Sequence, residues 1–268
     1  MKRIAMMFVL TLVATMTAAG LAMAQEPAPK PAPAGAAAAA AKPEAKAAAL
    51  PTVDEVLAKY VKASGGEEAL KKITSRTAKG AFDLPAMGAN GAFEMAAKAP
   101  NLSFTKIEIA GFGAITNVYD GKSAWAQDPM SGLRELKGAE LVMTQIQSDF
   151  YRELRMKELY KSLTVKGREK IASGSTIVVE AVPSEGSPEK YYFDETTGLL
   201  VRHDAEVESP QGKMPTEIVY EDYKVVDGVN TWHTMKMTNP AVAFTIKIEE
   251  MKSNVPVDAA KFTKPAGQ

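Results

Sequence analysis

The sequence predicts a mainly β fold of the α+β class. We expect a single curved antiparallel sheet, a half-open barrel of about 10–11 strands, wrapped around amphipathic helices that act as a lid. Short runs rich in β-branched and aromatic residues, separated by turn dipeptides, fill residues 73–251. An amphipathic helical segment precedes these runs and a second one interrupts them. A single sheet with two helices to cover curls around them, so both apolar helix faces should lie on its concave side.

The first helix is predicted to begin directly after Thr52. This residue is a good N-cap, and Glu55 three positions later completes a capping box. The apolar positions share one face at helical spacing: Val53, Val56, Leu57, Tyr60 and Val61. Gly65 and Gly66 should end the helix, and "EEALKKI" begins a shorter helical turn.

Four turn signals indicate that neighbouring strands are antiparallel. Asn90-Gly91, Asp120-Gly121 and Asp227-Gly228 each lie between β-rich runs, which is the strongest short-range signal for a hairpin. The "ETTGLL" segment around Gly198 predicts a fourth turn.

Residues 139–159, "AELVMTQIQSDFYRELRMKEL", interrupt the strand pattern. Val142, Ile146, Phe150 and Leu154 recur every fourth residue, with Met143 alongside and charges on the opposite face. We predict one continuous amphipathic helix here, the lid, with Val142, Ile146 and Phe150 turned toward the sheet.

Residues 1–24 are predicted to be a cleaved signal peptide. Lys2 and Arg3 precede a long apolar run, and "AMA" before Gln25 is a small-x-small cleavage site. The alternative is an uncleaved membrane anchor. Residues 25–50 are almost wholly Ala, Pro, Lys and Glu, which predicts a disordered tether. The folded domain is then residues 51–268.

Composition and motifs exclude several classes of function. The formal net charge of +0 gives no basic excess for binding nucleic acid. With Cys 0, the exported chain has neither disulfides nor a lipid-modified cysteine, so we predict a periplasmic protein without a lipid anchor. The sequence lacks a phosphate-cradling glycine loop and GxSxG or HExxH motifs. We therefore predict no cofactor, no metal ligands and no catalytic residues.

The fragment "RHD" at 202–204 raises the question of a catalytic pair. On a regular strand, His203 and Asp204 point to opposite faces, and His203 shares the apolar face with Leu199, Val201, Ala205 and Val207. We predict that His203 is either satisfied by a neighbouring carbonyl or hydroxyl group, or is a polar spot within a ligand cavity. The same two readings apply to His233.

Five segments resemble a known family: "YVKASGGEEALKKITSRTAKGAF", "VYDGKSAWAQDPMSG", "YYFDETTGLLVRHD", "EDYKVVDGVNTWHTMKM" and "KIEEMKSNVPVDAAKF". Together they are similar to the outer-membrane lipoprotein-sorting (LolA/LolB-like) superfamily of periplasmic carriers, over residues 51–262. The resemblance implies a half-open antiparallel barrel with a helical lid. Its apolar cavity would hold the acyl chains of a lipoprotein or another hydrophobic ligand.

The candidate ligand-binding residues are those expected on the apolar faces of the strands and of the lid. They are Phe82, Phe93, Phe104, Trp125, Val142, Ile146, Phe150, Phe193, Val201, His203, Met235, Phe244 and Ile246. Strand alternation identifies the apolar face but not which part of it stays open, so each residue could equally belong to a closed core. Flexible methionine side chains suit variable apolar ligands.

We therefore predict a periplasmic carrier for an acyl chain or another hydrophobic ligand. The expected partners are an acylated lipoprotein or a lipid-like ligand, an envelope protein, and peripherally a membrane, with no nucleic acid. Two alternatives remain open. One is an envelope-stress sensor or interaction domain of the same fold, and the other is a hydrolase that uses His203 or His233 as its base.

Overall fold

The computed structural model describes residues 49–209 and 212–266. The predicted signal peptide at 1–24 and nearly all of the predicted tether lie outside the described residues, so both stay predictions. Within the described ranges, no helix combines the length and apolar character needed to cross a membrane.

One large antiparallel sheet dominates the described part of the chain. Its thirteen strands follow the order β6-β5-β4-β3-β2-β1-β15-β14-β11-β10-β9-β8-β7, and a separate hairpin pairs β12 with β13. The first strands are β1 (Ser75–Leu84), β2 (Ala89–Lys98), β3 (Leu102–Ile109), β4 (Gly113–Tyr119), β5 (Ala124–Asp128), β6 (Gly132–Glu135), β7 (Ser162–Ile171) and β8 (Gly174–Val182). The others are β9 (Glu189–Asp194), β10 (Leu200–Ser209), β11 (Gly212–Glu221), β12 (Lys224–Val226), β13 (Val229–Thr231), β14 (Thr234–Thr238) and β15 (Ala243–Ser253).

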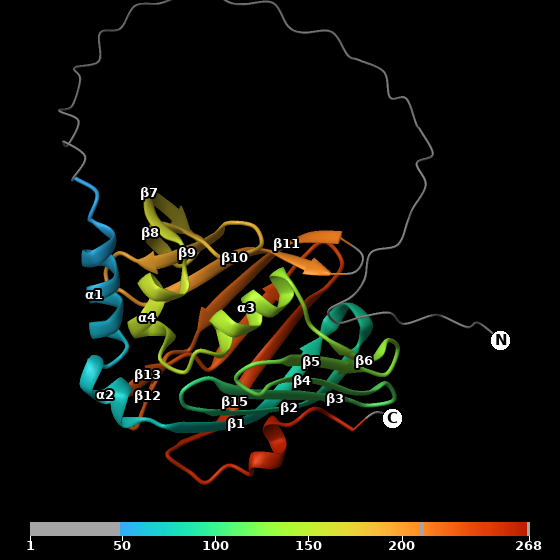
Figure 1. Ribbon diagram of the computed structural model, residues 1–268. Helices are drawn as coiled ribbons and strands as arrows, with labels where there is room; N and C mark the ends of the chain where they lie inside the picture. The colour runs from blue at the N-terminus through green and yellow to red at the C-terminus, as the bar shows by residue number, and fades with distance from the viewer. Residues whose placement is uncertain (1–48, 210–211, 267–268) are drawn as a thin grey trace, which may run out of the picture.

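The helices are α1 (Val53–Ala63), α2 (Glu67–Lys72), α3 (Ala139–Ser148) and α4 (Arg152–Leu159), with short turns η1 (Pro85–Met87) and η2 (Ala259–Phe262). Figure 1 shows α3 between two arms of the sheet, one containing β1 to β6 and the other containing β7 to β11. Helix α3 contacts both β4 and β10, which stand far apart in the strand order. The sheet is therefore strongly curved. It is not closed, because its edge strands β6 and β7 do not pair with each other.

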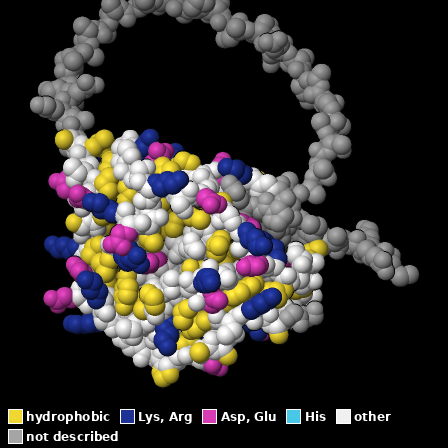
Figure 2. Space-filling view, viewed as in Figure 1, with side chains coloured by type: hydrophobic (Ala, Val, Ile, Leu, Met, Phe, Trp, Pro, Cys, Tyr) yellow, Lys and Arg dark blue, Asp and Glu magenta, His cyan; other side chains and the backbone are white. Residues whose placement is uncertain are grey.

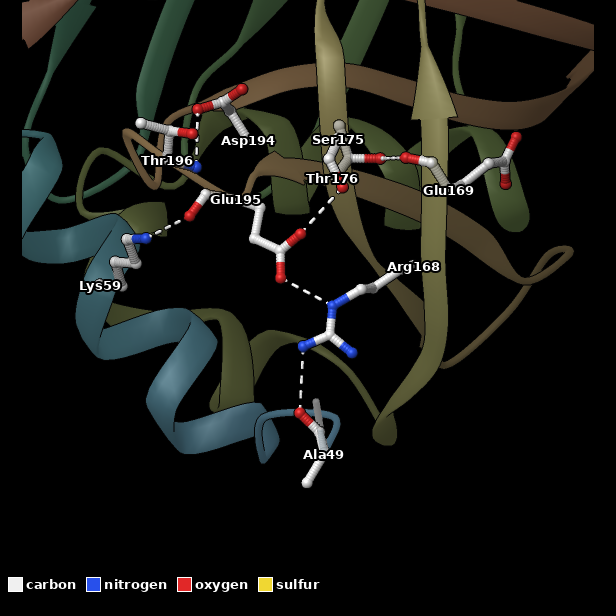
Figure 3. Close-up of polar contacts among 9 residues, drawn as sticks. All are labelled: Ala49, Lys59, Arg168, Glu169, Ser175, Thr176, Asp194, Glu195 and Thr196. Atoms are coloured by element: carbon white, nitrogen blue, oxygen red, sulfur yellow. Dashed lines mark hydrogen bonds and ion pairs between the residues drawn. The ribbon is translucent and has the colours of Figure 1, made fainter. Parts of the chain in front are cut away.

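Helix α1 forms as its sequence predicts. Thr52 caps it, and the full capping box with Glu55 is present. Its buried residues, Val56, Leu57 and Tyr60, pack on strands β8, β9 and β10. Its polar side reaches the turn after β9. Figure 3 shows Lys59 donating to the backbone carbonyl of Glu195, whose carboxylate binds Arg168 at 2.7 Å. Helix α1 thus binds the β9–β10 turn directly, and through Glu195 of that turn it is connected to Arg168 of β7.

Five apolar clusters are present among the described residues, and three of them bear on the predicted site. The first core is Ala78, Phe82, Leu84, Phe93, Ile107, Ile109, Ile115, Met237, Val242, Phe244, Ile246 and Ile248. The second core is Val56, Leu57, Tyr60, Ile146, Met156, Tyr160, Ile177, Val179, Ala181, Tyr191, Phe193, Leu200 and Tyr220. The outer cluster is Ala96, Phe104, Val118 and Phe262. Helices α1, α3 and α4 all contribute to the second core, which confirms that they lie on the concave side.

Three of the four turn predictions are confirmed. Asp120-Gly121 joins β4 to β5, Gly198 lies between β9 and β10, and Asp227-Gly228 joins β12 to β13 with positive φ angles of 51° and 82°. The Asn90-Gly91 prediction is wrong, because both residues lie within β2 and the chain reverses at η1 instead. A glycine is needed at position 91 for a different reason: a Cβ there would lie 2.1 Å from the carbonyl oxygen of Glu108 on β3, too close for any side chain.

The single helix predicted over 139–159 is also wrong, since the segment forms α3 and α4 with a break between them. Asp149 has extended backbone geometry, and its carboxylate accepts a hydrogen bond from the backbone N–H of Tyr151. The backbone N–H of Phe150 donates to the carbonyl of Pro100 at 2.9 Å. Short polar side chains compete for backbone groups in this way, which is why Asp149 ends the helix despite the continuing apolar spacing.

Candidate functional site

A cavity of about 530 Å³ lies against the concave face of the sheet, beside α3. A volume of this size is typical of sites for small organic ligands. Its apolar lining includes Phe93, Ile107, Ile218, Trp232, Phe244 and Ile246 and five methionines, Met95, Met143, Met214, Met235 and Met237. The flexible thioethers of methionine adapt to ligands of different shape.

The cavity exists because the helices fill only part of the concave surface. Tyr60 of α1 packs on Phe193 with ring centroids 5.1 Å apart, so α1 covers the sheet near β8, β9 and β10. No helix of the described residues covers the floor formed by the first core in the same way. Phe93, Phe244 and Ile246 form this floor, because they belong to the first core and also line the cavity.

Helix α3 presents two different faces. Val142 and Ile146 turn toward the second core, where Ile146 is only 4% exposed. Ala139, Met143 and Gln147, which recur every fourth residue, line the cavity. Two of the three predicted lid residues, Val142 and Ile146, therefore pack into the second core, and a neighbouring stripe of α3 borders the cavity together with Phe150.

The structure brings several predicted ligand-binding residues to this cavity. They are Phe93, Trp125, Phe150, His203, Met235, Phe244 and Ile246. Phe82, Val142, Ile146, Phe193 and Val201 do not line it, and neither does Phe104. Phe82 faces the same side as Ile246 but is sealed within the first core, 1% exposed, beside Phe244. Whether the lining residues bind a ligand stays a prediction.

Phe104 lies on the opposite, convex face of the sheet. It pairs with Val118 in the register and packs under Phe262 of η2, and Lys261 lies 4.8 Å from its ring. Trp125 is opposite Val118 on the next strand and joins the same outer cluster, although it also borders the cavity near the sheet edge. The prediction that Phe104 lines the ligand cavity is therefore wrong. Strand alternation does not reveal that the C-terminal segment covers the convex face.

A β-bulge changes which residues of β10 face inward. The register shifts between Leu200 and Arg202, so Leu200 faces Phe193 and His203 faces Tyr191, while Val201 is the extra residue. Strict alternation placed Val201 inward with His203 and Leu200 outward, and both placements were wrong, because the bulge turns Leu200 inward, where it is 4% exposed. The conclusion about "RHD" is confirmed, because Asp204 pairs with Arg202 on the other face while His203 is 2% exposed.

His203 belongs to a buried polar cluster at the wall of the cavity. Its Nε2 atom lies 2.9 Å from Oε2 of Glu189, and its ring stacks on Tyr191 with centroids 4.3 Å apart. The hydroxyl groups of Tyr160 and Tyr191 each donate to the same carboxylate at 2.8 Å. His203 and Glu189 both line the cavity. His203 is thus satisfied by a carboxylate, a partner that the sequence analysis did not name.

The partners of Glu189 decide its charge. Burial raises the pKa of this carboxyl, but hydrogen bonds from His203, Tyr191 and Tyr160 and the charge of His203 outweigh burial, so its pKa lies below the ordinary value of 4.5. Alternation along "EKYYF" could have found this residue, since Glu189, Tyr191 and Phe193 share one face of β9.

His233 lies in a different environment. It is 7% exposed, and its Nδ1 atom is 3.1 Å from the backbone carbonyl of Thr231. It does not line the cavity. His233 is therefore a buried histidine satisfied by a neighbouring carbonyl group, which was one of the two predictions for it. Among the described residues, no group of three or more histidine, aspartate or glutamate side chains could hold a metal ion.

Charged side chains also reach the cavity. Three arginines line it, Arg76, Arg134 and Arg152, and so do six carboxylates: Glu140, Asp149, Glu153, Glu185, Glu189 and Glu206. Arg134 makes a two-pronged ion pair with Glu140, both bonds being 2.8 Å. On the outside, Figure 2 shows basic and acidic side chains interspersed over the visible face, with no histidine in view. The mixed charge agrees with the formal net charge of +0 and offers no basic surface to nucleic acid on that face.

No protein-family model and no curated protein matches the sequence. Solved structures do match its fold. A DUF1329 family protein from Desulfovibrio piger is 13% identical, with a TM-score of 0.53 over 79% of this chain and 97% of its own. A LolA superfamily protein from Nitrosomonas europaea is also 13% identical, with a TM-score of 0.53 over 80% and 99%. A domain provisionally described as an outer membrane lipoprotein-sorting protein, from Vibrio parahaemolyticus, is 12% identical with a TM-score of 0.51 over 78% and 97%.

These similarities confirm the fold that the sequence resemblance implied. The chain has a LolA-like fold, with a curved antiparallel sheet around helices. At such low identity the similarity extends to the fold alone.

Proposed function

We propose that this protein is a periplasmic carrier that binds the acyl chain of a lipoprotein or another hydrophobic ligand in the cavity beside α3. The observation that carries the proposal is the cavity itself: about 530 Å³, floored by the first core and walled by methionines. The LolA-like fold supports the same function, because one of the similar structures is described as a lipoprotein-sorting domain.

Burial of an acyl chain supplies enough free energy without any catalytic group. Each methylene transferred from water to an apolar site contributes roughly 0.8 kcal/mol. A ligand that places several methylenes against Phe93, Ile107 and Met235 would gain several times that amount, less the cost of ordering the ligand.

Filling the cavity tests the proposal. Ala97 and Thr105 line the cavity on neighbouring strands, so Ala97→Phe and Thr105→Phe would place rings inside it. Ala92 on β2 is exposed and does not line the cavity, so Ala92→Phe is the matched control. We expect both cavity variants to lose binding of a fluorescent fatty acid by at least about tenfold, with the control unchanged. Equal binding by all four proteins would place the ligand elsewhere and refute the proposal.

Native mass spectrometry of the protein purified from a bacterial periplasm separates the rival functions. A co-purifying acylated molecule supports the carrier. A stable complex with an envelope protein, without lipid, would favour the sensor or interaction domain. Turnover of ester substrates that is lost in His203→Gln would favour the hydrolase, because His203 is the histidine that borders the cavity.

A further inference from the structure

Two buried polar atoms lack hydrogen-bond partners among the described residues, and they lie at the same place in the sheet. They are Nε of Arg76 and Oγ of Ser253. Arg76 on β1 stands directly opposite Ser253 on β15, so their side chains share one face. That face is the concave one, because Arg76 lines the cavity together with its other neighbour, Ala97. An N–H and a hydroxyl group are therefore left unsatisfied beside the cavity.

A second arginine joins them. Arg152, at the start of α4, also lines the cavity, and in the described part of the chain it makes no ion pair and no side-chain hydrogen bond. Both arginines line the same cavity, and both are influenced electrostatically by Glu153 and Tyr60.

Several of the other charged groups that line the cavity have partners. Arg134 is held by Glu140, Asp149 is paired with Arg155, and the Glu189 carboxylate accepts from His203 and two tyrosines. Glu153 acts on the charge of both arginines and Asp227 on that of Arg76, but among the described residues neither carboxylate forms an ion pair with either arginine. Arg76 and Arg152 are therefore left without a carboxylate bonded to them.

Leaving the buried Nε–H of Arg76 without a hydrogen bond is costly, since its desolvation is not compensated. Burial lowers the pKa of Arg76, which is the sign of this cost. A bound oxyanion would remove this desolvation cost. The planar guanidinium of an arginine donates to two oxygens of a carboxylate or phosphate, and the hydroxyl group of a serine can donate to a further lone pair.

We propose that Arg76 and Arg152, which line the cavity, and Ser253, which lies opposite Arg76 at its edge, form a head-group site, and that the ligand is an amphiphile with an apolar chain and an anionic oxyacid head, a carboxylate or a phosphate. This inference rests on the proposed carrier function and adds the chemical class of the ligand. The apolar chain would lie against Phe93, Ile107 and Met235, and the head would lie at the end of the cavity where β1 and β15 carry Arg76 and Ser253.

The test compares ligands of equal chain length and different heads. Hexadecanoic acid, hexadecyl phosphate and hexadecanol compete against a neutral fluorescent probe, N-phenyl-1-naphthylamine, at a pH where the acid is ionised. We expect the wild-type protein to bind the acid and the phosphate at least about tenfold more tightly than the alcohol, because charge-assisted hydrogen bonds contribute to the anionic ligands alone.

Variants locate the site. Arg76→Gln and Arg152→Gln should each reduce the preference for the anionic heads toward equality while alcohol binding stays the same. Arg134→Gln is the control, since Arg134 lines the same cavity but is committed to Glu140. If Arg76→Gln does not fold, Arg152→Gln and Ser253→Ala carry the test, and thermal midpoints of all variants report folding.

The outcomes separate the two proposals. Equal affinity of the wild type for the acid and the alcohol would overturn the head-group site and leave the carrier function in place. Failure of all three amphiphiles to displace the probe would overturn the carrier function as well. Binding of inorganic phosphate alone as tightly as hexadecyl phosphate would show a site for free anions, which contradicts the amphiphile assignment.

Discussion

Nε2 of His203 lies 2.9 Å from Oε2 of Glu189, on the strand next to its own. The two residues are fourteen positions apart in the sequence, and each is no more than 3% exposed. Tyr191, directly opposite His203, stacks on the imidazole with an interplanar angle of 7°. This pair places polar groups in the wall of the cavity. Because the Glu189 carboxyl can be protonated, the pair also makes the stability of the protein depend on pH.

Stability should fall in acid through Glu189. Its pKa in the folded protein lies below 4.5, so as the pH drops the unfolded chain binds this proton first. The stabilisation is therefore fully present above about pH 4.5 and is lost as the pH falls toward the folded-state pKa. Glu189→Gln should lower the unfolding free energy at neutral pH by about 1–3 kcal/mol and flatten its dependence on pH below that value.

Urea unfolding followed by circular dichroism over a series of pH values measures this effect. Glu68→Gln is the control, because Glu68 on α2 is exposed and away from the cluster. An acid dependence of equal steepness in the Glu189→Gln variant would show that other carboxyl groups govern it.

Replacing His203 should affect stability rather than any turnover. His203→Gln keeps a hydrogen-bond donor for Glu189 but loses the stacking on Tyr191, so we expect a loss of about 1–2 kcal/mol. His233→Gln, in a site away from the cavity, is the comparison. Ester hydrolysis is assayed alongside. Wild-type activity that disappears in folded His203→Gln while surviving in His233→Gln would contradict the carrier function.

The two faces of α3 should respond differently to truncation. Ile146 is buried in the second core, so Ile146→Ala should cost about 2–5 kcal/mol of unfolding free energy. Met143 borders the cavity, so Met143→Ala should cost less, because its surroundings are already open, and should change ligand affinity instead. Urea midpoints and fatty-acid titrations on both variants measure the contrast. Equal loss of stability in the two would mean that α3 is core on both faces.

The C-terminal turn η2 should stabilise the sheet without touching the ligand. Phe262 is 4% exposed and packs on Phe104 on the convex face, and Lys261 pairs with Glu94 at 2.6 Å. Phe262→Ala should cost about 3–5 kcal/mol through the cavity that it leaves, while fatty-acid affinity stays the same. Lys261→Ala removes a part-buried charge that pairs with Glu94 and lies over the Phe104 ring, and should cost about 1 kcal/mol. A drop in ligand affinity for folded Phe262→Ala would show that the two faces are coupled.

Local chemistry made several elements predictable from the sequence. The capping box of Thr52 and Glu55, the glycines that end α1 and the turns at Asp120 and Gly198 all depend on neighbours within a few residues. The helical segment in the middle of the strands was also found from its spacing. Its break was missed because two hydrogen bonds replace helical ones there. The Asp149 carboxylate accepts from the backbone N–H of Tyr151, and the backbone N–H of Phe150 donates to the carbonyl of Pro100. The spacing of apolar residues reveals neither bond.

The sequence by itself determined the class of fold, the antiparallel pairing of neighbouring strands and the inward face of strands such as β2 and β14, because alternation and turn preferences are local; it did not reveal the bulge in β10 or the convex placement of Phe104. Tertiary structure decided which part of that face stays open. Phe193 is covered by Tyr60 and Phe104 by Phe262, whereas Phe93 and Met235 are left at a cavity. These contacts join segments far apart in the chain. Whether an apolar residue becomes core or cavity wall depends on what packs over it, and only the folded chain determines that.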